Sequence, residues 1–209
     1  MKNIDDTSRP RTPDRPQPKS IASPTNNVLE LLRDDQLIKL ILSNKATLAM
    51  IRPNIANSMK AELIESSPEE TLERNIVDLN VLLKFSFVFD LIAIDEFYIG
   101  KAKQDQKERP PEKDLHMPNR WAEFVGIMTA GPTIGLVLSS DKVGATETWR
   151  KQVGSWNIEQ AADPSTLRGK FGIHNYNNLL HGSDNPSEAC REINIIAQCI
   201  DRNHTDFSK

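Results

Sequence analysis

The sequence has few cysteines, no excess of basic charge and no long apolar segment. Cys190 and Cys199 are its two cysteines, and no histidine lies at zinc-ligand spacing from them, so the sequence predicts neither a metal site nor a disulfide framework. The formal net charge of −3 gives no indication of nucleic acid or an anionic membrane as a partner. The apolar stretches are interrupted by charges, and the N-terminal residues lack the apolar region of a secretory signal. We therefore expect a cytoplasmic protein.

The first residues have the composition of an extended arm. Residues 1–24 contain five prolines and no aromatic side chain, so they cannot bury enough apolar surface to order themselves. We expect residues 1–26 to be disordered or ordered by a partner, and an amphipathic docking helix to follow at 27–44. The folded domain is expected at 45–203, with a short tail at 204–209.

The rest of the chain alternates strand-like and helix-like segments. Buried strands are expected near 47–52, 86–95, 133–139 and 193–199, and helices at 66–85, 120–128, 143–153 and 186–191. This order is typical of an α/β (α+β) sandwich of ferredoxin-like type, with a four-stranded antiparallel sheet and helices on one face. Residues 154–178 form an unusually long loop, and loops of that length are usually functional.

His181 lies in an unusual place, in the middle of the run NNLLHGSD (177–184), directly after two leucines. The Gly-Ser-Asp that follows it predicts a turn that leads into a helix. A histidine beside a glycine at the start of a helix could act as a nucleophile. From the residues alone, a turn histidine without a chemical role is the alternative interpretation.

Four segments carry a family resemblance: AMIRPN, AGPTIGLVL, ETWRKQVG and STLRGKFGIHNYNNLLHGSD (165–184). In this order they resemble the nucleoside diphosphate kinases, over roughly residues 45–200. The last segment carries the family's N-x-x-H-G-S-D signature, which is highly specific. The TWRKQVG helix and the N-terminal additions look more like those of the divergent, cilium-associated members than those of the housekeeping enzymes. The resemblance implies the ferredoxin-like sandwich that the segment order also predicts.

The resemblance also implies a role for each matching residue. His181 would take the γ-phosphate of a nucleoside triphosphate and pass it to a diphosphate, while Glu192 fixes the imidazole tautomer and Ser183 supports that glutamate. The nucleotide, with Mg²⁺, would be bound by four further polar residues and one aromatic residue: Arg52, Arg150, Arg168, Asn178 and Trp121.

The chain also departs from the family pattern. Arg52 replaces a lysine, Trp156 replaces a phosphate-binding threonine, and no tyrosine matches the one near the active histidine, since Tyr98 lies too far upstream. Arg52 could instead form a strand-end salt bridge, and Trp156 could simply pack. We therefore expect weak or absent turnover in a subunit of an axonemal or cytoskeletal assembly, held by residues 1–43. Deletion of that segment should then leave the domain folded but detached. An active nucleoside diphosphate kinase is the alternative.

Overall fold

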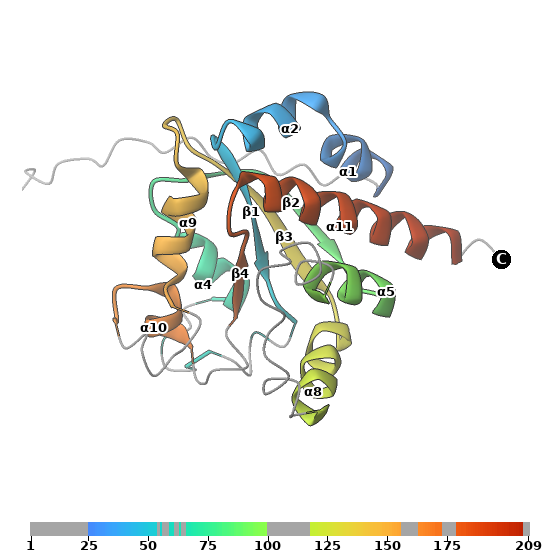
Figure 1. Cartoon of the computed structure of the whole chain (residues 1–209). Helices are drawn as coiled ribbons and strands as arrows, with labels where there is room; N and C mark the ends of the chain where they lie inside the picture. The colour runs from blue at the N-terminus through green and yellow to red at the C-terminus, as the bar shows by residue number, and fades with distance from the viewer. Residues whose placement is uncertain are drawn as a thin grey trace, which may run out of the picture.

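One antiparallel sheet organises the molecule (Figure 1). The computed structural model describes residues 25–53, 55, 59–60, 63, 66–99, 118–155, 163–172 and 179–206. The strands are β1 (Ala46–Ile51), β2 (Asn80–Phe87), β3 (Thr133–Ser139) and β4 (Leu180–Gly182), in the order β2-β3-β1-β4. Every neighbouring pair is antiparallel. The predicted four-stranded antiparallel sheet is therefore confirmed.

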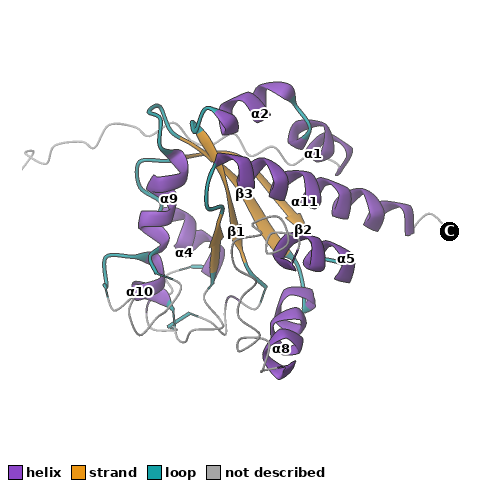
Figure 2. Cartoon of the chain, viewed as in Figure 1, coloured by secondary structure: helices purple, strands orange, loops and turns teal. Residues whose placement is uncertain are grey.

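Helices cover both faces of this sheet, so the expectation of helices on one face is wrong (Figure 2). Successive residues of a strand point to opposite faces, and β1 is buried at all six positions. Leu48 and Met50 join one apolar cluster, whereas Ala49 and Ile51 join the other. The first cluster lies under α1 (Thr25–Leu32), α2 (Asp35–Leu42), α5 (Leu91–Ile94), α8 (Pro118–Thr129) and α11 (Pro186–Asp206). The second lies under α4 (Pro68–Arg74), α9 (Ala145–Val153) and α10 (Leu167–Phe171).

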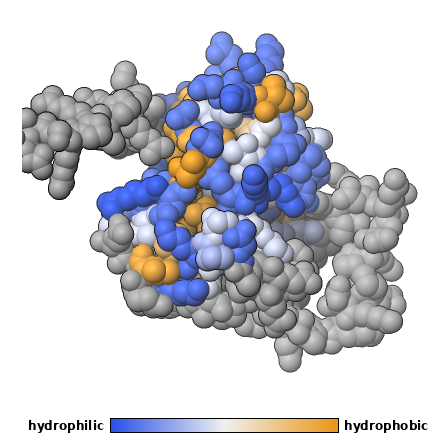
Figure 3. Space-filling model, turned by 90° about the vertical axis from the view of Figure 1, so that its left-hand side faces the viewer, coloured by the Kyte–Doolittle hydropathy of each residue, from blue (hydrophilic) through white to orange (hydrophobic). Residues whose placement is uncertain are grey.

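The outer surface around α9 is predominantly hydrophilic, with small scattered apolar areas (Figure 3). This agrees with the amphipathic pattern of α9, in which Trp149 and Val153 are buried while Arg150 and Lys151 are exposed. Among the helices that the structure describes, none is both long and apolar enough to cross a membrane.

The predicted strand at 193–199 is wrong, because this segment continues α11. Its buried residues Ile193, Ile196 and Ile200 recur at three- and four-residue spacing, whereas Asn194 is exposed, so the helical period describes the pattern better than alternation does. The fourth strand is instead the three-residue β4, which carries His181.

The boundaries around β2 were also predicted wrongly. The helix expected at 66–85 ends at Arg74, and β2 starts at Asn80 with alternating burial. The strand expected at 86–95 gives way after Phe87 to α5 and then to the π-helix η2 (Asp95–Ile99). Asp90 starts that helical segment, because its carboxylate accepts a hydrogen bond from the amide of Ala93 at 2.6 Å.

The helix expected at 27–44 is two helices, because Asp34 caps a new start by accepting from the Gln36 amide at 2.6 Å. Leu29, Leu32 and Ile41 are buried in the first apolar cluster, so both helices belong to the core of this domain. Docking to a partner stays a prediction, and the arm at 1–24 lies outside the described residues.

Asn44, just before β1, caps α9 from a distant part of the chain. Its backbone carbonyl accepts from the amides of Gly144 and Ala145 at 2.9 and 3.0 Å, and its side-chain oxygen accepts from Thr146 at 3.1 Å. Gly144 itself makes no side-chain cap. The N-terminal segment therefore helps to fix the helix that carries Arg150.

Candidate active site

The main chain of His181 is held by two neighbouring elements, β1 and α9. In β4 it pairs with Met50 of β1, and the preceding Leu179 accepts a hydrogen bond from the Arg52 amide at 2.9 Å. The indole nitrogen of Trp149 in α9 donates to the carbonyl oxygen of His181 at 3.1 Å. The position of the histidine is therefore set by the sheet and by α9 together.

The imidazole of His181 is oriented by a buried carboxylate. Its Nε2 lies 3.1 Å from Oε2 of Glu192, and the Ser183 hydroxyl donates to the same oxygen at 2.5 Å. Glu192 is 1% exposed. Burial acts to raise the pKa of Glu192, but the charge of His181 and the hydrogen bonds from His181 and Ser183 outweigh it, so the pKa is lowered. The ionised carboxylate thus fixes which imidazole nitrogen carries the proton.

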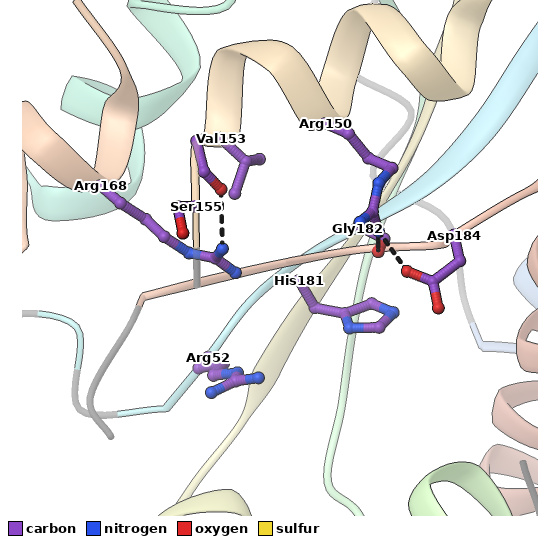
Figure 4. A pocket seen from close by; sticks show the side chains of 9 residues that line it. Arg52, Arg150, Val153, Ser155, Arg168, His181, Gly182 and Asp184 are labelled. Atoms are coloured by element: carbon purple, nitrogen blue, oxygen red, sulfur yellow. Dashed lines mark hydrogen bonds and ion pairs between the residues drawn. The ribbon is translucent and has the colours of Figure 1, made fainter. Parts of the chain in front are cut away.

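Three arginines surround His181 in a cleft of about 540 Å³ (Figure 4). Arg168 is buried and donates to the carbonyl oxygens of Gly154 at 3.0 Å and Leu180 at 2.6 Å. Burial, followed by the charges of Arg52 and Arg150, lowers the pKa of Arg168 to about 10. A cleft that holds three like charges favours an anion.

Arg150 reaches this cleft from α9. Its Nη1 forms an ion pair with Asp184 and lies 3.4 Å from the carbonyl oxygen of Gly182. The side chains of both ion-pair partners are about half exposed, so solvent screens the pair and an anion can compete for the arginine. Within the described part of the chain, no three acidic, histidine or cysteine side chains are grouped to hold a metal ion.

Two buried donors in or beside the cleft find no acceptor among the described residues: Arg52 Nε and the Tyr98 hydroxyl. Arg52 lies over the ring of Phe124, with 5.3 Å from its guanidinium carbon to the ring centroid. Burial raises the pKa of Tyr98, so its hydroxyl stays protonated. Unpaired buried donors are rare in folded proteins, so these two are candidates to bind an acceptor.

The expectation that no tyrosine lies near His181 is wrong. The rings of Tyr98 and His181 are 6.3 Å apart, and Phe97 lies edge-on to the imidazole at 5.2 Å. Both aromatic residues come from η2, whose compact backbone follows directly after α5. Tyr98 is far from His181 in the sequence, but the chain turns after β2 and brings η2 next to β4.

The two other predicted site residues are Asn178 and Trp121. Asn178 lies outside the described residues, and of Trp121 only the backbone, in α8, is described. Trp156, which was not among the predicted site residues, also lies outside the described residues. The structure thus brings together six of the predicted residues: Arg52, Arg150, Arg168, His181, Ser183 and Glu192. Asp184, Phe97 and Tyr98 join them without having been predicted as site residues.

Gly182 is required where β4 passes α9. A Cβ atom at this position would lie 2.7 Å from Cδ1 of Trp149, whose indole is buried and hydrogen bonded. We expect Gly182→Ala to destabilise the fold by about 1–3 kcal/mol through overpacking, measured by thermal unfolding. Gly126→Ala is the control, because that position in α8 has open space and alanine favours a helix. A Gly182→Ala protein as stable as the wild type would contradict this role.

Comparison with known proteins agrees with this geometry. A family model described as nucleoside diphosphate kinase matches residues 45–199. A nucleoside diphosphate kinase of Listeria innocua is 40% identical over 74 residues, covering 35% of this chain and 48% of that protein. One from Halalkalibacterium halodurans is 36% identical over 102 residues, 49% of this chain and 61% of that protein. The chain thus spans about half the length of these relatives.

Two longer matches cover nearly all of the other protein. A nucleoside diphosphate kinase of Corynebacterium efficiens is 27% identical over 150 residues, 71% of this chain and 93% of that protein. The crystal structure of the Aquifex aeolicus nucleoside diphosphate kinase superposes with a TM-score of 0.53 and 26% identity, covering 73% of this chain and 94% of that chain. With the family model matching most of its length, this chain belongs to the nucleoside diphosphate kinase family.

Proposed function

We propose that this protein transfers the γ-phosphate of a nucleoside triphosphate to a nucleoside diphosphate through phospho-His181. One observation carries the proposal: Glu192 holds Nε2 of the imidazole, in a cleft that three arginines line. With the proton on Nε2, Nδ1 keeps a free electron pair, which is what a phosphoryl acceptor requires. The surrounding guanidinium groups suit the negative charge of a transferring phosphoryl group.

The chemical step follows from these roles. The Nδ1 electron pair forms a bond to the γ-phosphorus, the bond to the bridging oxygen breaks, and its electrons remain on the leaving diphosphate. The imidazole becomes more positive as this bond forms, and the Glu192 carboxylate stabilises that charge through Nε2–H. A second nucleoside diphosphate reverses the step and regenerates the free histidine.

The resemblance supplies roles for the rest of the nucleotide. Trp121 would stack on the base, and Asn178 would bond a ribose hydroxyl. Arg52 Nε is suited to donate to a phosphate oxygen, because it is a buried donor without an acceptor among the described residues. Mg²⁺ bound on the nucleotide's own phosphates would neutralise part of their charge.

Initial-rate kinetics test the proposed function. With Mg-ATP and a second nucleoside diphosphate varied together, the protein should give the parallel double-reciprocal lines of a ping-pong cycle. Intersecting lines would require both nucleotides in the site at once and would contradict a phosphohistidine intermediate. A folded protein without any exchange would contradict the proposed activity itself.

Turnover is expected to be low, because the resemblance places Trp156 where the family has a phosphate-binding threonine. A lost hydrogen bond to a charged group weakens binding by about 1.5–3 kcal/mol, which corresponds to roughly 10–150-fold in rate if the bond forms in the transition state. We expect Trp156→Thr to recover part of this factor in kcat/KM. Trp156→Phe, which lacks the hydroxyl, is the control and should recover less. Equal gains in both variants would mean that bulk, not the hydroxyl, limits the rate.

A second candidate function is a subunit of an axonemal or cytoskeletal assembly, with weak or no turnover. Residues 1–44 precede the region that matches the family, and α2 leaves Leu40 and Leu42 exposed to a potential partner. A location at the cilium rests on the resemblance of the sequence to divergent family members.

Deletion experiments separate docking from folding in this segment. We expect deletion of residues 1–43 to lower the unfolding temperature, because it removes Leu29, Leu32 and Ile41 from the first apolar cluster and exposes the side chains that they cover. Burial of a side chain of this kind contributes about 1.5–3 kcal/mol. Deletion of residues 1–24 alone is the control and should leave thermal unfolding unchanged. If the protein that lacks residues 1–43 unfolds at the same temperature as the full chain, α1 and α2 do not stabilise the domain and their role is in docking alone.

A further inference from the structure

Arg191, next to Glu192 on α11, ties this helix to the end of η2. Its Nη1 donates to the carbonyl oxygen of Glu96 and its Nη2 to that of Phe97, both at 3.0 Å. Its Nε and Nη2 also donate to Glu188, at 3.1 and 2.9 Å. The side chains of Arg191 and Glu188 are only 16% and 13% exposed, so this ion pair is better shielded from solvent than a surface pair.

The segment that Arg191 binds, η2, carries the two aromatic residues that pack against His181: Phe97 and Tyr98. Phe97 lies edge-on to the imidazole at 5.2 Å and contacts Tyr98, with 4.9 Å between their ring centroids. Tyr98 in turn packs against Phe124 at 4.8 Å, and the Arg52 guanidinium lies over that ring. Through Phe97 and its aromatic neighbours, Arg191 is therefore connected both to His181 and to Arg52.

We propose that Arg191 is a positioning residue for phosphoryl transfer: it fixes η2 against α11, so that the His181 imidazole is held between Glu192 and the rings of Phe97 and Tyr98. This inference rests on the proposed function for its effect on rate. Its structural part, the orientation of the His181 ring, does not depend on turnover.

The geometry explains why an arginine is needed at this position. A planar guanidinium can serve two backbone carbonyls and a carboxylate at the same time, whereas a lysine ammonium presents a single point of charge on a flexible stem. π-Helical turns are rare and are frequently found at functional sites. Arg191→Lys keeps the charge near Glu192 but loses the fork, so it isolates the geometric role.

The test compares Arg191→Lys with Arg202→Lys. Arg202 lies on the same helix and holds Asp90, at the start of α5, at 3.0 Å, so it ties the other end of the same segment to α11. The chain has four histidines, and the NMR signals of His181 can be assigned as those that are missing from the spectrum of His181→Gln. Ring currents from Phe97 and Tyr98 should shift the imidazole C–H resonances of the wild type. We expect this shift to be lost in Arg191→Lys and kept in Arg202→Lys.

Single-turnover labelling with excess Mg-ATP supplies the second readout. In Arg191→Lys the rate constant for phosphohistidine formation should fall roughly 10–100-fold, since a misplacement of about 1 Å has effects of that size. The half-saturating Mg-ATP concentration should change less than about threefold, because the nucleotide contacts remain. Phe97→Leu, which keeps Arg191 and removes the ring, should lower the rate constant in the same way if Arg191→Lys proves unstable.

The outcomes are distinguishable. If the wild type takes no phosphate, the proposed function fails, and the ring-current shifts alone decide the positioning role. An Arg191→Lys protein with wild-type imidazole shifts, or with the same loss of shift and rate as Arg202→Lys, would overturn the inference.

Discussion

His181→Gln is expected to abolish phosphate transfer, with nucleotide binding largely retained. The glutamine side chain can still hydrogen bond to Glu192, so the buried carboxylate keeps a neutral partner. It has no nitrogen with an electron pair free to attack phosphorus, so the covalent step is lost. The arginines that line the cleft remain in place. Exchange activity should therefore fall below detection, while equilibrium binding of ADP stays within about threefold of the wild type.

The control for this variant is thermal unfolding, which should change little because the backbone contacts of residue 181 to Trp149 and β1 do not involve the imidazole. Residual exchange above a tenth of the wild-type rate would mean that another residue accepts the phosphate.

Glu192→Gln has the second largest expected effect. The amide can neither stabilise the charge that develops on the imidazole nor fix its tautomer as the carboxylate does. Orienting and acid–base roles of this kind contribute about 10²–10⁴-fold in rate, so kcat should fall by a factor in that range. Glu73→Gln, at a carboxylate that pairs with Lys84 on the other side of the sheet, is the matched control and should leave kcat unchanged.

The same substitution predicts a change in the pH dependence of stability. Because the folded-state pKa of Glu192 is lowered from its ordinary value of 4.5, ionised Glu192 stabilises the fold above that value, and this stabilisation is lost as the pH falls through the folded-state pKa. Denaturant titrations should show the wild type losing stability below about pH 4.5 more steeply than Glu192→Gln. Parallel curves in the acid range would contradict an ionised, buried carboxylate, and unchanged kcat would contradict its role in orientation.

The helices and strands that were predicted correctly from the sequence are those whose starts are marked by a proline or a glycine. β3 and α9 matched their expected ranges closely, because a buried apolar run follows Pro132 and a helical pattern follows Gly144. The segment at 193–199 misled, since a helix packed on the core and a buried strand share the same apolar composition. β2 was misplaced because Leu79, Leu82 and Leu83 continue the three- and four-residue spacing of a helix, whereas in this edge strand burial alternates and Leu82 is exposed.

Some residues of the candidate site could be predicted from the sequence, and others could not. The signature predicted His181 as a nucleophile with Glu192 and Ser183 as its supporting residues, and the structure brings these three side chains together, because β4 and α11 are neighbours in the sequence. Tyr98, Phe97 and Arg191 were not predicted as site residues, because their proximity depends on a π-helix and on how it packs against α11. Neither leaves a periodic pattern in the sequence. The main-chain acceptors of Arg168 are equally invisible before the chain is folded.

Localised labelling tests the central claim most directly. The full chain is incubated with γ-labelled ATP and Mg²⁺, digested at alkaline pH to preserve phosphoramidates, and the labelled peptide is sequenced by mass spectrometry. A phosphate on His181 that is released by acid and discharged by a nucleoside diphosphate is the predicted result. A folded wild-type chain that carries no label, or carries it on a serine or on another histidine, would contradict the account.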